Sequence, residues 1–311
     1  MPRDAILSTL AYYDVLDMPL SADEAFRYLI KKPGNDILKF SRIQEYCDEL
    51  AREKKIAERE GRYYLFDREY LVPLKLERER LARRKWERTY RIMRWLRAVP
   101  FIKIVFASGS LSMNNTDEQS DLDIIIVARY GRIWLARLLT LFVLTVLGAR
   151  RRQSDMVAPD KICPNHFITD ASLEIPYRSL YTAQLYANLV PLIVRDRSLL
   201  EAFQSANTWV TEYLDHWKID GTRIFEPGLS AHVQYAGEKL LSRKLGDWLE
   251  SAAADWQRRR IATRKLEIRP GGHLTYTDEA LAFHSGSSER EILQRYNSLL
   301  SALTTPPDLP L

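Results

Sequence analysis

The spacing of apolar side chains in the first part of the chain predicts three helices. Residues 3–16 place their apolar side chains at helical spacing, and a third helix with one apolar face is expected over residues 41–54. Between them, Ser21 and Glu24 have the spacing of a capping box, in which each side chain bonds to the backbone of the other. This box predicts that the second helix begins at residue 21 and runs to Ile30.

A hairpin is expected directly after the third helix. Ile56 and the apolar run Tyr63–Phe66 lie on either side of a Gly61-Arg62 turn, which predicts two short antiparallel strands. Three helices followed by a strand, a turn and a strand are the order of a winged helix. We therefore expect a winged-helix-like domain over residues 1–68.

One long basic helix is expected next, over residues 68–98 and interrupted near Pro73, so that residues 69–98 connect two domains. Between residues 75 and 97 it carries ten Lys or Arg against three Glu, interleaved with Trp86, Tyr90 and Trp95. Two interpretations remain open. The charges form a solvated face, or they contact phosphates while the aromatic rings stack on bases.

The pattern then changes to short apolar, β-branched runs. Strands are expected over residues 101–107, 121–128 and 161–168, with a helix over 133–148 between the last two. These elements predict a small mixed sheet in a core domain of residues 99–176. Residues 177–311 are expected to form a mainly helical C-terminal domain with one short strand and a last helix, so the fold class is α+β.

Composition limits the setting and the partners. The chain has 311 residues and two cysteines, too few for a disulfide framework or a cysteine-rich zinc site, and we expect a cytoplasmic protein without a secretory signal. The most apolar stretch, residues 138–149, is too short to span a membrane and predicts a buried helix, with peripheral membrane contact as the alternative. The net charge of +5 favours an anionic partner, either a nucleoside triphosphate or a nucleic acid.

The residues between the first two core strands carry the candidate chemistry. In the string SGSLSMNNTDEQSDLDIIIV, Gly109-Ser110 follows one strand and Asp121-Leu-Asp123 opens the next. Successive side chains of a strand alternate between its faces, so Asp121 and Asp123 point the same way, about 7 Å apart along the backbone. Two carboxylates at this spacing predict a shared divalent metal site, and a solvent-exposed loop is the alternative.

The same segment offers groups for a phosphate. Gly109 permits a close approach to the backbone, and the hydroxyl and N–H of Ser110 at a helix start donate hydrogen bonds. Ser108 and Ser120 are further candidates. Lys161 and the run Arg150–Arg152 either reach a triphosphate or form a solvated turn.

A strand, Gly-Ser, a short helix and Asp-x-Asp on the next strand resemble the DNA polymerase β nucleotidyltransferase superfamily over residues 101–128. The resemblance implies that Gly109 and Ser110 hold the β and γ phosphates and that Asp121 and Asp123 bind Mg²⁺ or Mn²⁺. It implies transfer of a nucleoside monophosphate, most simply AMP from ATP, to a hydroxyl group. The acceptor stays open among a small molecule, a protein and an RNA end.

The chain departs from the family at the third carboxylate, which usually lies on a later strand. The predicted strand 161–168 contains no acid, so Asp160 just before it is the first candidate and Asn165 within it the second. His166 is a possible base or a structural residue. The alternative function is therefore a winged-helix nucleic-acid-binding regulator with a weak or inactive nucleotide-binding core. The near-neutral charge of the predicted recognition helix, residues 39–55, argues against it.

Overall fold

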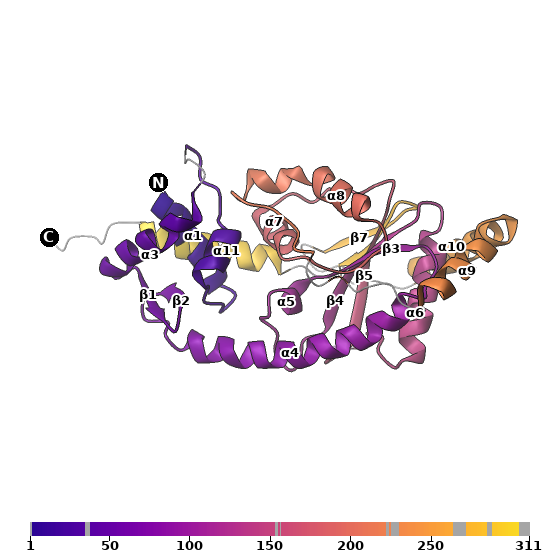
Figure 1. The fold of residues 1–311 in the computed structure, drawn as a ribbon, viewed down its shortest axis with the longest axis horizontal. Coiled ribbons are helices and arrows are strands. Elements are labelled where there is room, and N and C mark those ends of the chain that lie inside the picture. Colours follow the sequence, from indigo (N-terminus) through magenta and orange to yellow (C-terminus); the bar gives the residue numbers. More distant parts are fainter. Residues whose placement is uncertain are drawn as a thin grey trace.

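The computed structural model describes residues 2–34, 38–152, 155, 157–221, 224, 230–263, 272–284 and 288–304. These residues form an elongated α+β molecule, with the first helices at one end, a mixed sheet in the middle and a helical pair at the other end (Figure 1). The α+β class and the mixed sheet are confirmed.

The N-terminal end contains three helices and a hairpin. The helices are α1 (Pro2–Asp14), α2 (Ala22–Arg27) and α3 (Ile43–Arg52), the last preceded by the short 3₁₀ helix η1 (Phe40–Arg42). The strands β1 (Ile56–Arg59) and β2 (Arg62–Leu65) pair antiparallel. The capping box is confirmed, because the Ser21 side chain accepts from the N–H of Glu24 and the Glu24 carboxylate accepts from the N–H of Ser21. An isolated bridge between Leu20 and Tyr63 adds the α1–α2 connection to the hairpin.

Helix α4 (Leu71–Leu96) runs from the hairpin along the sheet without a break (Figure 1). The predicted interruption at Pro73 is wrong. Pro73 is the third residue of the helix, and an N–H in the first turn has no intrahelical acceptor to lose.

The central sheet has the strand order β6-β3-β4-β5-β8-β7. Its strands are β3 (Ile102–Ala107), β4 (Leu122–Ala128), β5 (Ile162–Thr169), β6 (Val190–Val194), β7 (His273–Tyr276) and β8 (Ala280–His284). Only the β4–β5 pair is parallel, as expected for a mixed sheet. Three strands come from residues beyond 176, so the sheet does not end where the core domain was expected to end. The short run Val-Pro-Leu-Ile-Val of β6 has too few residues to distinguish a strand from part of a helix by periodicity.

Helices cover both faces of the sheet. Ile104 and Phe106 pack toward α7 (Leu180–Ala187) and α8 (Arg197–Ala206), which the 3₁₀ helix η2 (Thr208–Glu212) follows. Val105 and Ala107 belong to the opposite apolar cluster, with side chains of α4, α6 (Ile133–Val146) and α10 (Lys244–Thr263). This alternation places two separate cores on the two faces of one strand.

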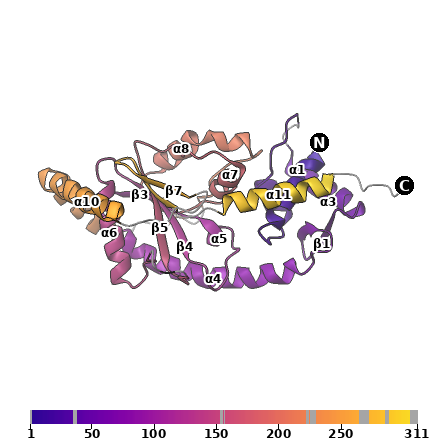
Figure 2. The ribbon, with the colours of Figure 1, turned by 180° about the vertical axis from the view of Figure 1, so that it is seen from behind.

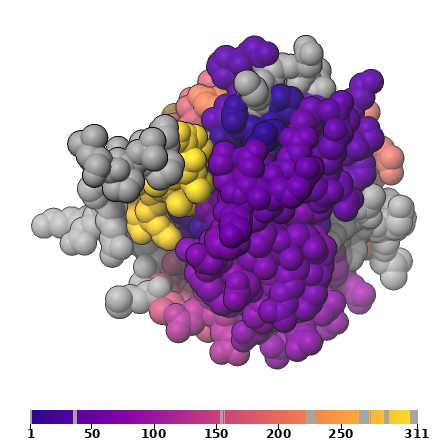
Figure 3. All heavy atoms as spheres, turned by 90° about the vertical axis from the view of Figure 1, so that its left-hand side faces the viewer, coloured from indigo at the N-terminus to yellow at the C-terminus, as the bar shows by residue number. Residues whose placement is uncertain are grey.

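The ends of the chain meet. The last helix, α11 (Glu289–Thr304), packs against α1 and α7, so it lies beside the N-terminal helices (Figures 2 and 3). Helix α9 (Ser230–Leu241) pairs with α10 at the opposite end (Figure 1). Within the described part of the chain, no helix combines the length and apolarity needed to cross a membrane. Helix α6 is only partly buried, because Phe142 is 63% and Val146 69% exposed.

Candidate metal and nucleotide site

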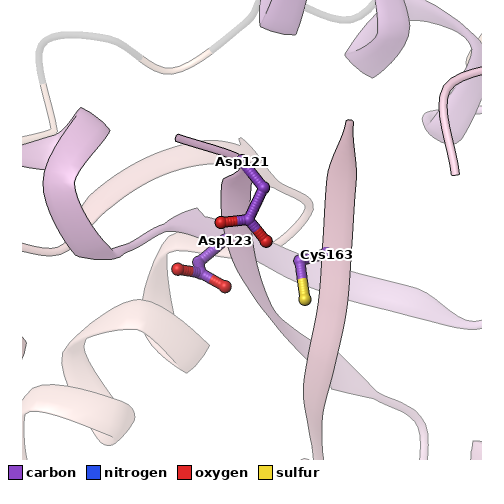
Figure 4. Close-up of side chains that lie close together, drawn as sticks. All are labelled: Asp121, Asp123 and Cys163. Atoms are coloured by element: carbon purple, nitrogen blue, oxygen red, sulfur yellow. The ribbon is translucent and has the colours of Figure 1, made fainter. Parts of the chain in front are cut away.

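Two neighbouring strands bring three potential ligands together. Asp121 directly precedes β4, Asp123 is the second residue of β4, and Cys163 is the second residue of β5. Parallel pairing sets Asp123 opposite Cys163, and one ligand atom from each of the three residues lies within 4.8 Å of the others. Figure 4 shows the two carboxylates beside the thiol. All three side chains are partly buried, so this corner of the sheet could hold a cation.

The backbone at Gly109 touches this group. Gly109 begins the single-turn helix α5 (Gly109–Ser112) with a φ of +68°, and a β-carbon built there would lie 2.8 Å from Asp123 Oδ2. The N–H of Ser108 donates to the carbonyl of Asp123 at 3.0 Å. Only glycine fits the first position of α5 without displacing the carboxylate.

Polar neighbours hold the two carboxylates from either side. The Arg151 guanidinium pairs with Asp121, and its Nη1 also lies 3.9 Å from Cys163 Sγ. The side-chain amide of Asn165 donates to Asp123 Oδ1 at 3.2 Å. A cationic side chain therefore contacts two of the three potential metal ligands.

The electrostatics of this corner disfavour a second negative charge. Burial, and then the neighbouring Asp121, raise the pKa of Asp123 to about 7, although Arg151 acts in the opposite direction. Burial and the two carboxylates also raise the pKa of the Cys163 thiol. A bound divalent cation would stabilise the ionised forms of all three groups.

Three predicted site residues make contacts elsewhere. Asp160 pairs with Lys85 Nζ at 2.9 Å, Ser120 accepts from the N–H of Asp117 at 3.1 Å, and Lys161 donates to the carbonyl of Gly148 at 2.5 Å. None of the three belongs to the Asp121–Asp123–Cys163 group. Of the two candidates for the missing acid, the structure brings Asn165 to Asp123 and turns Asp160 toward α4.

Cys163 was not predicted as a site residue from the sequence. A cysteine within an apolar strand resembles a core residue, and no periodicity distinguishes it from one. The available indication was its position, the second residue of a strand that pairs in parallel with the Asp-x-Asp strand. The parallel register had to be known before Cys163 could be placed beside Asp123.

Helix α4 supports the loop between Gly109 and Asp121. Lys75 Nζ donates to the carbonyl of Met113 at 3.1 Å, and Lys85 Nζ donates to the carbonyl of Ser120 at 2.7 Å. Trp86 Nε1 donates to the side chain of Asn114 at 2.8 Å. Trp86 is buried, so the idea that it stacks on a nucleic-acid base is wrong. Two of the basic residues of α4 thus bind loop carbonyls and do not form a solvated face.

A cavity of about 770 Å³ opens beside the carboxylates, within the size range of small-molecule sites. Ser108, Gly109 and Asp123 form part of its lining. The lining also includes basic and aromatic residues, among them Arg150, Arg151, Arg152, Tyr181, Trp256 and Phe283. Ser110, the second residue of α5, follows the cavity-lining Gly109 and is partly exposed. The cavity thus combines a carboxylate end with arginines and flat apolar surfaces.

Comparisons of the chain with family models, with curated proteins and with solved structures each find no match.

Proposed function

We propose that the protein is a metal-dependent nucleotidyltransferase that transfers a nucleoside monophosphate, most simply AMP from ATP, to a hydroxyl group of an acceptor. The contact between Gly109 and Asp123 carries this proposal. Gly109, with a φ of +68°, lies against the carboxylate of Asp123. A carboxylate oxygen of Asp121 lies within 4.8 Å of one of Asp123. Gly109 and Asp123 both line the cavity of about 770 Å³. A phosphate chain needs such a close backbone approach next to a divalent cation.

The residues divide into two tasks. Asp121 and Asp123 would hold Mg²⁺ or Mn²⁺, which when bound neutralises phosphate charge and favours the ionised acceptor hydroxyl. Ser108, Gly109 and Ser110 would bind the phosphates, and the arginines of the cavity would balance the charge of the leaving group. In the reaction the acceptor oxygen bonds to the α-phosphorus while the bond to the bridging oxygen breaks, and pyrophosphate leaves.

The acceptor hydroxyl must lose its proton, and a third carboxylate is the usual base. Asn165 lies at Asp123 and is not basic, while Asp160 pairs with Lys85. Among the described residues no third carboxylate joins Asp121 and Asp123, so the proton would pass to solvent. We therefore expect slow transfer and a strong dependence on the metal, which is why nucleotide binding is the first property to test.

Calorimetry with a non-hydrolysable ATP analogue tests the proposal. The parent protein should bind the analogue with Mg²⁺ and bind it at least about tenfold more weakly without Mg²⁺, because an uncompensated triphosphate meets two carboxylates. Asp121→Asn/Asp123→Asn should abolish the metal dependence. Asp117→Asn is a matched control, because Asp117 bonds locally to Ser120.

Failure of the folded parent to bind analogues of ATP, GTP, CTP and UTP would overturn the proposal. If one analogue binds, incubation with the corresponding labelled triphosphate and candidate acceptors follows. Small hydroxyl compounds, the protein itself and RNA ends are the three acceptor classes to compare. Transfer to RNA alone should weaken steeply with salt.

A second function, a winged-helix nucleic-acid-binding regulator, is favoured by the exposed face of α4. Arg80, Arg84, Arg91 and Arg94 recur at intervals of three, four or seven residues and are exposed, which makes a stripe about 20 Å long. The Leu20–Tyr63 bridge supports a winged-helix topology for the three helices and hairpin. Glu45, Asp48 and Glu49 on α3 oppose phosphate binding through that helix.

Fluorescence anisotropy with labelled single- and double-stranded DNA and RNA tests this second function. Binding through the stripe should lose about one unit of the salt slope for each arginine replaced by glutamine. A parent protein that binds no nucleic acid at low salt would eliminate the regulator.

A further inference from the structure

We infer that Asp121, Asp123 and Cys163 form a three-ligand centre selective for a thiophilic divalent cation of the Zn²⁺ class, with Cys163 at the position where a magnesium centre would carry a third carboxylate. The inference rests on the proposed function in that both use the same two carboxylates. It goes further by adding Cys163 as a third ligand, which shifts the preferred metal from Mg²⁺ or Mn²⁺ to the Zn²⁺ class.

The geometry fits three ligands around one ion. One atom from each residue lies within 4.8 Å of the other two. Tetrahedral zinc requires sulfur–oxygen separations of roughly 3.6 Å, from bonds of about 2.3 and 2.1 Å. Two oxygens bound at about 2.1 Å would lie roughly 3.4 Å apart, so ligand atoms up to 4.8 Å apart must close by at most about 1.4 Å.

Two strands hold the ligands at this spacing before any ion arrives. The parallel register sets Asp123 opposite Cys163, and Asp121 lies two residues before Asp123, directly before the start of β4. A catalytic zinc site typically has three protein ligands and one open position. The cavity lined by Asp123 and Cys163 provides space for a water molecule or a phosphate oxygen at the fourth position.

A second observation shows that these atoms already attract one cation. The Arg151 guanidinium pairs with Asp121, and the same nitrogen lies 3.9 Å from Cys163 Sγ. Asn165 donates to Asp123 Oδ1 at 3.2 Å and orients that carboxylate. A positively charged group thus contacts two of the three atoms that would ligate the metal ion.

The donor set decides the metal class. Mg²⁺ prefers oxygen ligands in an octahedral arrangement and gains little from sulfur. Zn²⁺ and Cd²⁺ bind thiolates strongly, with release of the thiol proton to solvent. Two carboxylates and one thiolate therefore favour the thiophilic ions.

Cd²⁺ titration of the full-length protein tests the inference, because a thiolate bound to Cd²⁺ gives an ultraviolet charge-transfer absorption that needs neither nucleotide nor activity. We expect one equivalent of Cd²⁺ to produce this absorption in the parent protein. Cys163→Ser should abolish it and weaken Cd²⁺ binding at least about tenfold. Cys47→Ala is the matched control, since Cys47 is buried within the N-terminal helices and should leave the absorption unchanged.

A variant with an expected gain in metal binding keeps the inference testable if Cys163→Ser fails to fold. Cys163→Asp replaces the soft ligand with a hard one, so Cd²⁺ binding should weaken while Mg²⁺ binding, measured by calorimetry, should strengthen. Circular dichroism verifies that each variant is folded.

The same preparations are also titrated with the Mg²⁺–ATP analogue. Loss of the Cd²⁺ absorption in Cys163→Ser supports the metal centre even if no nucleotide binds and the transferase proposal fails. Cd²⁺ binding in the parent without thiolate absorption, or with unchanged affinity in Cys163→Ser, overturns the inference even if nucleotide binding succeeds.

Discussion

Gly109, just after the end of β3, lies against Asp123, near the start of the neighbouring strand β4: a β-carbon on Gly109 would lie 2.8 Å from Asp123 Oδ2. The glycine also has a φ of +68°, which other residues adopt at a cost of about 1–2 kcal/mol. Backbone conformation and side-chain space thus both require glycine at this position. The contact fixes the position of the Asp123 carboxylate relative to the turn at Gly109.

Gly109→Ala should therefore lower the metal-dependent affinity for an ATP analogue by at least about tenfold, because the new methyl group displaces Asp123. Gly131→Ala separates the two effects. Gly131 has a φ of +71° with nothing within 4 Å of an added β-carbon, so this variant carries only the backbone cost of about 1–2 kcal/mol. Thermal unfolding and calorimetry measure both properties. Equal loss of nucleotide affinity in the two variants would contradict the steric explanation.

Arg151→Gln should raise the affinity of the nucleotide-free protein for Mn²⁺. The guanidinium competes with a metal ion for Asp121, and the pair is partly exposed, so its removal is expected to strengthen binding severalfold, up to about tenfold. Arg152→Gln is the control, since Arg152 is exposed and lines the same cavity. Calorimetry should show the increase in the first variant alone. A decrease in Arg151→Gln would mean that the arginine supports the metal site.

Helices and strands that a local sequence pattern determines could be predicted from the sequence. The capping box at Ser21 and Glu24 forms as expected, because both partners lie within one helical turn. The strand β4 begins one residue after the expected position. It could be predicted this closely because its apolar run is continuous. By contrast, β6 joins the sheet next to β3, and a five-residue run containing a proline does not reveal that pairing.

In the candidate site, too, the residues placed by a local pattern could be predicted, and those placed by the tertiary structure could not. Asp121 and Asp123 share a side because strand alternation is local. Asp160 was the first candidate for the missing acid because it lies just before β5, yet a positive φ of 59° and the Lys85 ion pair turn it toward α4. Cys163 requires the parallel register of β4 and β5, which is a property of the tertiary structure.

Asn165 and Asp160, the two residues that the sequence offered in place of the missing acid, can be distinguished by mutation. Asn165→Ala removes the hydrogen bond that orients Asp123, so Mn²⁺ affinity should fall about tenfold or more. Asp160→Asn should leave that affinity within about twofold and instead destabilise the fold by about 1–2 kcal/mol, because buried Lys85 loses its charged partner. Calorimetry and urea unfolding give the two quantities. If Asp160→Asn lowered the Mn²⁺ affinity and Asn165→Ala did not, Asp160 and not Asn165 would belong to the metal site.

The metal-free protein should lose stability as the pH rises toward neutrality. The folded-state pKa of Asp123 is raised from 3.8 to about 7. Between these values the folded carboxyl group keeps a proton that the unfolded chain has released, so the free energy of unfolding falls with rising pH and levels off above about 7. Mn²⁺ affinity should change in the opposite direction, since the protonated carboxyl group does not bind a metal ion.

Urea unfolding of the parent protein and of Asp123→Asn, with a chelator present, measures the effect from about pH 5 to about pH 8. The variant has no group to titrate at this position, although Asp121, Arg151 and Cys163 still surround it. The parent should become less stable relative to Asp123→Asn as the pH rises through this window. A stability difference that stays constant would mean that Asp123 is already ionised at the lower pH, held in that state by the Arg151 guanidinium that pairs with its neighbour.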